Sequence, residues 1–277
     1  MWHNLGQLLR YRGLIQSLVA RDLKARYRGS VLGFFWSFIN PLLLLIVYSV
    51  VFTFFIKRPG ADAAHPDQLK GPYAVFMFCG LLPWTWFTTA LLEAAGSLIV
   101  SGNLIKKVLF PAEVLPIVSV LSSMVHFVFG LPILAAFLLY YEFIDPSAFI
   151  QLHAAELVWF PVVVLVQLIF TTGLALLLSS LTVHYRDIKD LLGNFLTFWF
   201  FLTPIIYSYR SGPIPIHWLN FNPFFHLAAS YQEILYFPEN AFGHWAWLLA
   251  MGGASIVFFL CAYWVFDRLR DSFAEAV

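Results

Sequence analysis

The chain has 277 residues, of which 61% are hydrophobic and 11% are charged, with a formal net charge of +1. Soluble domains carry about 25% charged residues, so a soluble fold could not cover this much apolar surface. The composition excludes a soluble enzyme, a disordered chain and a nucleic-acid-binding protein, and it indicates an integral membrane protein. Cys79 and Cys261 lie in apolar segments, which predicts small buried side chains.

Residues 5–28 carry a helical pattern with one basic face and one apolar face. At 100° per residue, four basic side chains fall on one narrow arc: Arg10, Arg21, Lys24 and Arg28. We expect residues 1–30 to form a cytoplasmic amphipathic helix that lies in the membrane interface, with its basic face toward anionic headgroups. An amphipathic helix packed on protein is the alternative.

Six segments are long and apolar enough to form transmembrane helices, which need about 20 residues. They run over residues 31–56, 73–100, 114–141, 154–181, 191–207 and 244–266. The predicted fold is therefore an all-α membrane domain over residues 31–266, followed by a cytoplasmic tail at 267–277. Pro204 near the end of the fifth segment predicts a kink or an end there.

The segment between the fifth and sixth predicted spans, residues 208–243, is too apolar for a solvated loop and contains four prolines. Irregular backbone at membrane depth is tolerated when it is buried in protein or lines a wet cavity. We expect short re-entrant helices at about residues 213–237. A folded external cap is the alternative.

The distribution of positive charge predicts the orientation of the spans. Twelve of the 16 Lys and Arg residues lie at the two chain ends and in residues 101–113 and 182–190. Because cytoplasmic loops are enriched in Lys and Arg, both termini are predicted to be cytoplasmic.

Motifs for nucleotide or metal binding are missing from the sequence. No lysine follows a glycine, so there is no P-loop, and there is no Cys-x-x-Cys motif and no histidine pair at i and i+4. We predict no catalytic residue, metal or cofactor in this chain. Ionisable residues within the spans are also sparse, which argues against a proton-coupled carrier. His126 is expected to be a hydrogen-bonded core histidine, and Glu93 to pair with a basic residue of the N-terminal helix.

Aromatic side chains are concentrated in the first and fifth predicted spans, within residues 33–38 and 195–201. Flat apolar rings with polar edges suit the apolar faces of sugar rings. Anchoring of the spans at the lipid interface is an equally good interpretation of the same rings.

Five segments spread over nearly the whole chain form a set. They are RDLKARYRGSVLGFFWSFINP at 21–41, NLIKK at 103–107 with FPAEVLP at 110–116, YRDI at 185–188, TPIIY at 203–207 and NP at 222–223. Together they resemble the permeases of type-2 ABC transporters that export polysaccharides, namely the O-antigen, capsule and teichoic acid exporters.

The resemblance implies a homodimeric transmembrane core that works with two copies of a separate ABC ATPase subunit, which holds ATP and Mg²⁺. It implies a coupling helix at about residues 97–110 that docks on the ATPase. The implied contact residues are Asn103, Lys106, Lys107 and Phe110. The positive-inside rule accounts equally for the two lysines.

The resemblance also implies a channel for the polymer between the first and fifth spans of two protomers. The implied aromatic lining is Phe34, Phe38, Phe195, Phe198 and Trp199. An external gate is implied around Trp218, Phe224 and Phe225. Arg26 and Arg28, near the start of the first span, are candidates to attract the phosphate of a lipid-linked glycan. Anchoring to anionic lipids is the alternative role for these two arginines.

The expected function is export of a lipid-linked polysaccharide across a bacterial inner membrane, powered by the partner ATPase. One alternative is a type-2 ABC exporter of a small lipid or drug. A second is a secondary carrier that needs no ATPase.

Overall fold

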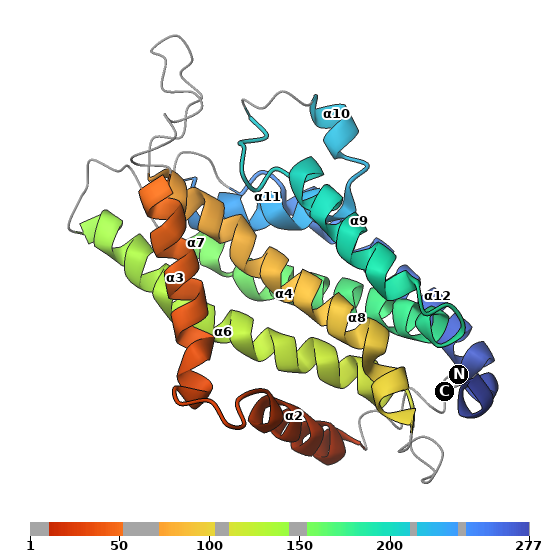
Figure 1. The fold of residues 1–277 in the computed structure, drawn as a ribbon. Helices are drawn as coiled ribbons and strands as arrows, with labels where there is room; N and C mark the ends of the chain where they lie inside the picture. Colours follow the sequence, from red (N-terminus) through yellow and green to blue (C-terminus); the bar gives the residue numbers. More distant parts are fainter. Residues whose placement is uncertain are drawn as a thin grey trace.

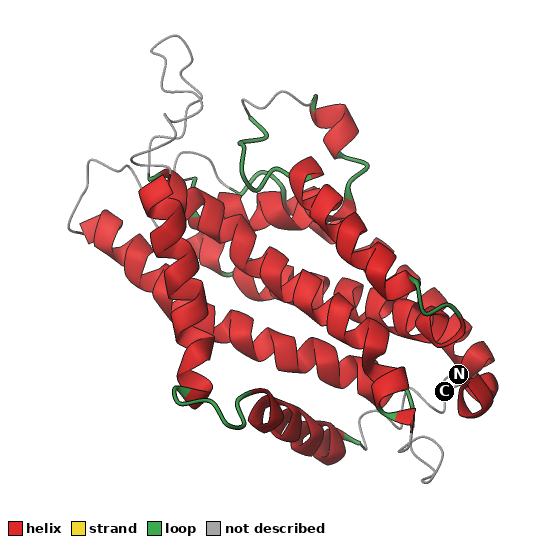
Figure 2. Ribbon diagram, viewed as in Figure 1, coloured by secondary structure: helices red, strands yellow, loops and turns green. Residues whose placement is uncertain are grey.

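The computed structural model describes residues 11–51, 72–102, 111–143, 154–210, 215–237 and 242–276. The described chain is helical and contains no strand (Figures 1 and 2). In chain order the elements are α2 (Arg12–Arg26), η1 (Gly33–Phe35), α3 (Trp36–Val50), α4 (Tyr73–Val100), α6 (Val114–Phe143), α7 (Ala154–Leu157), α8 (Phe160–His184), α9 (Ile188–Leu202), α10 (Ile216–Leu219), α11 (Pro223–Leu235) and α12 (Trp245–Ala276).

Among the described residues, four helices are long and apolar enough to cross a membrane: α4, α6, α8 with the turn before it, and α12. They match the second, third, fourth and sixth predicted spans. The helices of the first and fifth predicted spans, α3 and α9, have 15 residues each. Such a helix is about 22 Å long, which is shorter than the hydrocarbon core of about 30 Å. Residues 52–56 of the first predicted span lie outside the described residues.

The fifth predicted span ends earlier than expected, at Leu202 rather than at Tyr207. Thr203 has an extended backbone with φ −96° and ψ 132°. A residue that precedes proline is pushed out of the α region, and Pro204 has no N–H to continue the helix. The predicted kink or end at Pro204 is therefore confirmed, and only the outer bound at Tyr207 lies beyond the observed helix.

Helix α4 is the centre of the bundle (Figure 1), with α3 and α6 on one side of it and α8, α9 and α11 also packed on it. In its most apolar 18-residue window 78% of the residues are buried, against 28% for α12. The outer helix α12 packs mainly on α8. A helix apolar on all sides belongs in the interior, as α4 does.

Two glycines allow helices to approach closely. A Cβ on Gly130 of α6 would lie 2.4 Å from Leu82 Cδ1 of α4. A Cβ on Gly173 of α8 would lie 3.1 Å from the backbone Cα of Phe259 in α12. Small residues at such contacts let helix backbones approach in membrane proteins.

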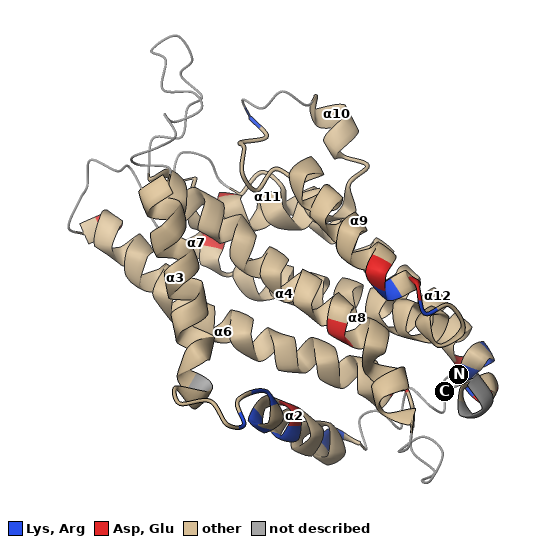
Figure 3. Ribbon diagram, in the orientation of Figure 1, with Lys and Arg blue, Asp and Glu red and all other residues tan. Residues whose placement is uncertain are grey.

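Charged residues gather at one end of the bundle, on α2, at the start of α9 and near the end of α12 (Figure 3). Helix α2 lies outside the bundle, and Leu18 packs against Val114 and Val118 at the start of α6. The apolar face of α2 is therefore packed on protein, which agrees with the alternative interpretation of its amphipathic pattern. Its position relative to a membrane interface stays a prediction.

The segment after α9 folds back onto the bundle. In α11 every residue from Phe224 to Leu235 is buried, against α4, α8 and α12. The short α10 lies at its outer side, with Trp218 exposed. Residues 267–276, predicted as a tail, continue helix α12. Cys79 is buried as predicted, whereas Cys261 is exposed on α12, so the prediction of burial is wrong for Cys261.

Candidate functional site

A groove of about 760 Å³ lies between α8, α9, α12 and the turn that joins α10 to α11. Seven of its lining side chains are aromatic: Phe170, Phe195, Phe198, Trp199, Trp218, Phe221 and Phe258. No charged residue is among its lining residues. We call it the aromatic groove. It brings together three of the predicted channel residues and one predicted gate residue.

Helix α9 contributes three of the rings, and two of them project from its exposed face. Leu192 and Leu196 are buried, whereas Phe195 and Phe198 are 54% and 62% exposed. Positions 195, 198 and 202 lie on one side of a helix because three- and four-residue steps return to the same face. The side chains at these positions all line the groove. The rings of Phe195 and Phe198 are therefore not covered by any other part of the described chain.

Trp199 is held rigidly at the back of the groove. Its ring meets those of Trp84 and Phe87 edge to face, at centroid distances of 6.0 and 5.5 Å. Its indole N–H donates to Asn222 Oδ1 at 2.7 Å. Such a ring is part of the core with one edge on the groove.

Asn222 joins the end of α9 to the start of α11. Its Oδ1 also accepts the Phe224 backbone N–H at 3.1 Å and so caps α11, while its Nδ2 donates to Thr203 Oγ1 at 3.0 Å. Asn222 was expected only as part of a family motif, and its capping role was not predicted. The signal was available, because asparagine followed by proline is a favoured start of a helix.

The predicted gate residues lie in two different environments. Trp218 is 66% exposed at the rim of the groove. Phe224 and Phe225 are fully buried. Phe224 meets Trp84 and Phe87, and Phe225 meets Tyr209 and His244. In this conformation only Trp218 of the three is placed to contact a molecule in the groove.

The two predicted channel residues of the first span lie apart from the groove. Phe34 is in η1, and its side chain lies outside the described residues. The Phe38 ring packs edge to face on Phe129 of α6, with centroids 4.8 Å apart. Helix α3 packs on α4 and α6, and α9 packs on α4 and α8, so the two sets occupy different edges of the bundle (Figure 1).

Arg26 is engaged by two carboxylates. Its Nη2 lies 2.7 Å from Asp22 Oδ2, and both oxygens of Glu93 accept hydrogen bonds from the guanidinium. Burial by itself would lower the pKa of Arg26, but the hydrogen bonds and charges of Glu93 and Asp22 raise it above its ordinary value. The predicted pairing of Glu93 with the N-terminal helix is confirmed. Arg28 is exposed and makes no ion pair with a described residue.

His126 of α6 uses both ring nitrogens in hydrogen bonds. Nδ1 lies 3.1 Å from the Ser122 carbonyl oxygen, and Nε2 bonds with the Tyr27 hydroxyl. The hydroxyl also lies 2.7 Å from Ser37 Oγ. The prediction that His126 is hydrogen-bonded is confirmed, and its side chain is half-buried.

A family model described as ABC-2 type transporter matches residues 13–236. The chain belongs to the ABC-2 type transporter family. It is 37% identical over 274 residues to the O-antigen export system permease protein RfbA of Myxococcus xanthus, covering 98% of each chain. It is 28% identical over 277 residues to two proteins of that same description from Klebsiella pneumoniae, covering 99% of this chain and 98% of theirs. The family predicted from the five sequence segments is confirmed.

In this ABC-2 chain the four residues predicted to contact an ATPase lie outside the described residues: Asn103, Lys106, Lys107 and Phe110. The described chain resumes at residue 111, just after the predicted coupling helix. Glu113 is 4% exposed, and its Oε2 lies 3.7 Å from Arg270 Nη1 near the end of α12. The start of α6 is therefore tied to α12, a contact that no sequence pattern predicted.

Proposed function

We propose that this chain is the permease subunit of an ATP-driven exporter of a lipid-linked polysaccharide of the O-antigen type. Its ABC-2 family membership and the O-antigen export named for its near-full-length relatives support the proposal. Because the sequence holds no P-loop, ATP and Mg²⁺ would bind on a separate ABC ATPase, present in two copies. Teichoic acid and capsule polymers are related substrates within the same proposal.

The aromatic groove is the observation that carries the proposal. A long polymer must slide, so each position along its path should bind weakly and to a similar extent. Stacking on flat rings is less directional than hydrogen bonding or ion pairing, and it tolerates shifts in register. The rings of Phe195, Phe198 and Trp218 line the groove without any charged neighbour in its lining.

In the proposed assembly, two copies of the chain enclose the channel between the first span of one copy and the fifth span of the other. Placement of α3 and α9 at different edges of the bundle supports this arrangement, because one chain alone cannot bring them face to face. Both helices also leave large apolar residues exposed, among them Leu43 and Val47 on α3 and Phe198 on α9.

The proposed location is a bacterial inner membrane with both termini in the cytoplasm. The gathering of charged residues at one end of the bundle supports this orientation (Figure 3). Helix α2 would then lie on the cytoplasmic side. Since Arg26 is neutralised by two carboxylates, Arg28 is the better candidate to attract the phosphate of the lipid carrier. Anchoring to anionic lipid remains the other role for Arg28.

The proposed power stroke begins when ATP binding closes the ATPase dimer. The motion moves the coupling helix at about residues 97–110, through contacts at Asn103, Lys106, Lys107 and Phe110. Displacement of α3 and α9 then opens the channel, and the segment at about 213–237 acts as the outer gate. In this scheme Phe224 and Phe225 position the gate from inside the core, while Trp218 contacts the polymer.

The test is glycan export by the purified permease–ATPase complex in vesicles, with matched substitutions on α9 and α10. Phe198→Ala combined with Trp218→Ala should lower the export rate about tenfold, because two stacking interactions of about 0.5–1.5 kcal/mol each are lost. Phe201→Ala is the control, since this ring is 62% exposed on the same helix but does not line the groove. Equal rates for all variants would contradict a role of the groove in export.

A type-2 ABC exporter of a small lipid or drug is the second candidate, because the groove is almost wholly apolar. Glycan export and lipid export can be distinguished in the same vesicles by supplying a fluorescent phospholipid in place of the glycan and measuring its transport. ATP-dependent movement of the lipid without glycan export would favour the second candidate. Glycan movement under a proton gradient without the ATPase would favour a secondary carrier.

A further inference from the structure

The hydroxyl of Tyr27 lies where three helices meet. Tyr27 directly follows α2, and its hydroxyl bonds to Ser37 Oγ of α3 at 2.7 Å and to His126 Nε2 of α6. The other ring nitrogen of His126 lies 3.1 Å from the Ser122 carbonyl oxygen. One phenol group therefore joins the end of α2 to the start of α3 and to α6.

The direction of each hydrogen bond in this chain of contacts follows from its last member. The Ser122 carbonyl can only accept, so Nδ1 of neutral His126 carries the proton and Nε2 is an acceptor. The Tyr27 hydroxyl then donates to Nε2, and its oxygen accepts from Ser37 Oγ. A tyrosine makes both bonds at once, whereas a phenylalanine of the same shape would make neither.

Ser37 is the buried polar contact of a helix that is otherwise largely exposed. Only Ser37 and Leu45 are buried among the 15 residues of α3. Ser37 is 1% exposed, and Tyr27 is the one side-chain partner of its hydroxyl among the described residues. Because a buried hydroxyl without a partner is costly, the position of α3 depends on Tyr27.

The linker from α2 to α3 contains two glycines with left-handed backbone. Gly29 has a φ of 81° and Gly33 a φ of 50°, values that residues with a side chain rarely adopt. A Cβ at either glycine would meet no atom within 4 Å, so the backbone angle and not close packing requires glycine there. The Tyr27–Ser37 hydrogen bond spans this linker and is the contact that fixes its two ends relative to each other.

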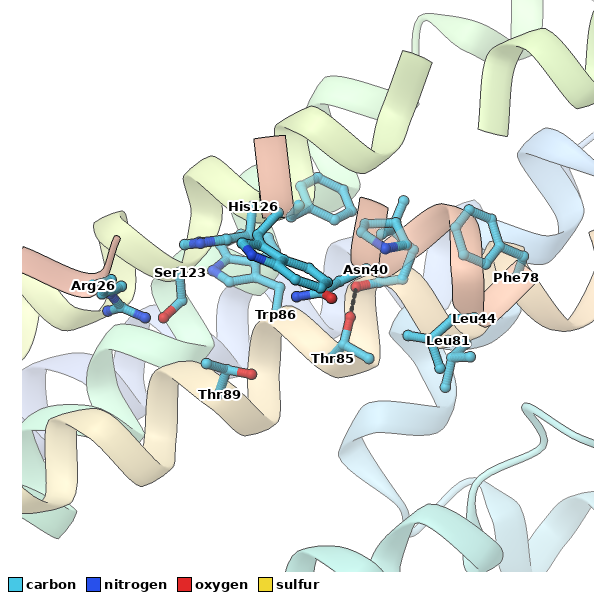
Figure 4. A pocket seen from close by; sticks show the side chains of 14 residues that line it. Arg26, Asn40, Leu44, Phe78, Leu81, Thr85, Trp86, Thr89, Ser123 and His126 are labelled. Atoms are coloured by element: carbon cyan, nitrogen blue, oxygen red, sulfur yellow. Dashed lines mark hydrogen bonds between the residues drawn. The ribbon is translucent and has the colours of Figure 1, made fainter. Parts of the chain in front are cut away.

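The residue before Tyr27 connects the same point to α4. Arg26 is paired with Glu93, which lies about two turns before the end of α4. Arg26 and His126 lie toward the same end of a cavity of about 230 Å³ between α3, α4 and α6 (Figure 4). Trp36 and Asn40 of α3 line this cavity as well, so the start of α3 has space beside it in which to move.

We propose that Tyr27 is a positioning residue for export, which acts through Ser37 to set the place of α3. The inference rests on the proposed function and adds to it the contact by which motion reaches the first span. Displacement of the end of α4, next to the predicted coupling helix, would move Arg26 through Glu93. Tyr27 would move with its neighbour and carry the start of α3 with it.

The first test measures the distance between α2 and α3 by double electron–electron resonance on the purified permease–ATPase complex in nanodiscs. Spin labels are attached at Gln16→Cys and Val50→Cys, which are exposed positions on α2 and α3, in a Cys261→Ser background. Labelled chains are diluted with unlabelled ones, so that distances within one chain dominate. With a non-hydrolysable ATP analogue, the distance distribution should be about twofold broader in Tyr27→Phe than in the wild type.

The matched control is Tyr11→Phe. Tyr11 lies at the other end of α2, and its hydroxyl makes no hydrogen bond with a described residue. The variant removes the same atom from the same helix, so its distance distribution should equal that of the wild type.

The second test measures the amount of glycan exported per ATP hydrolysed by the same complex in vesicles. This ratio should fall about fivefold in Tyr27→Phe with the KM for ATP unchanged, because the ATPase still closes while α3 no longer follows. Ser37→Ala should lower the ratio as well. The double variant should be no worse than Tyr27→Phe alone, since both substitutions remove one shared contact.

Distance distributions that are equal in Tyr27→Phe and the wild type would overturn the proposal, and so would an unchanged export ratio or additive losses in the double variant. The distance measurement uses no glycan, so it separates this failure from failure of the proposed function. A broadened distribution in Tyr27→Phe, together with no glycan export by the wild-type complex, would contradict the proposed substrate and leave the Tyr27 contact supported.

Discussion

At the scale of single residues, Asn222 explains why a short asparagine–proline motif stands between α9 and α11. One side-chain amide caps α11 at Phe224, holds the indole of Trp199 and bonds to Thr203. The same side chain thus positions both Trp199 in the wall of the aromatic groove and the start of helix α11.

Replacement of the Asn222 side chain should destabilise the contact of α9 with the start of α11. Asn222→Leu is expected to lower the free energy of unfolding by about 2 kcal/mol, because it removes a helix cap and leaves the partly buried indole N–H of Trp199 unpaired. Asn220→Leu is the control, since the Asn220 side chain makes no hydrogen bond with the described residues. Denaturant unfolding of the purified permease measures the difference, and similar losses in both variants would contradict the role of Asn222.

Arg26 and Glu93 form the ion pair that ties α2 to the bundle, with side chains 24% and 32% exposed. Arg26→Gln or Glu93→Gln should each cost about 1–2 kcal/mol, since each leaves a partly buried charge without its partner. The double variant should cost less than the two single costs added together. Arg28→Gln should leave thermal stability unchanged. Additive single costs in the double-mutant cycle would show that the pair does not hold α2.

At the scale of elements, the contact between α8 and α12 depends on a glycine that faces backbone. Gly173→Ala places its methyl 3.1 Å from Phe259 Cα, so α12 must shift. We expect a loss of about 1–3 kcal/mol from this overpacking. Gly253→Ala is the matched control, because its Cβ would meet nothing within 4 Å. The two variants are compared by thermal unfolding in the same detergent, and equal melting temperatures would contradict a close α8–α12 contact at this glycine.

The amphipathic pattern of α2 predicts which face is apolar, but it does not predict which surface that face contacts. The helical wheel predicted its apolar face, and Leu18 with its neighbours forms that face in the structure. What the face packs against depends on α6, which is about a hundred residues away in the chain. A pattern in one segment does not contain that information.

At the scale of the whole molecule, α3 and α9 lie at different edges of the bundle, so the proposed channel would need a second copy of the chain to close it. With Cys261→Ser as background and Cys79 buried, paired cysteines at Val47 and Phe198 should form a disulfide between two chains of the assembled transporter. Oxidation should give a dimer-sized band on a non-reducing gel, and either cysteine alone should not give the same band. A cross-link confined to single chains would contradict the proposed arrangement.

The sequence by itself determined the class of the molecule, the places of its four long apolar helices and the family, because composition, segment length and short motifs are local properties. The pairing of Glu93 with a basic residue of α2 also followed from local reasoning, since an acid within a span needs a partner.

Only the tertiary structure decided which aromatic rings are free. Phe198 and Trp218 are exposed in the groove. Trp199 also lines it but is held by Asn222, Trp84 and Phe87, and Phe224 and Phe225 are buried. Aromatic residues surround α9 on several sides, so no helical wheel distinguishes these roles. The environment of each ring is set by the helix packed against it, and that neighbour comes from a distant part of the chain.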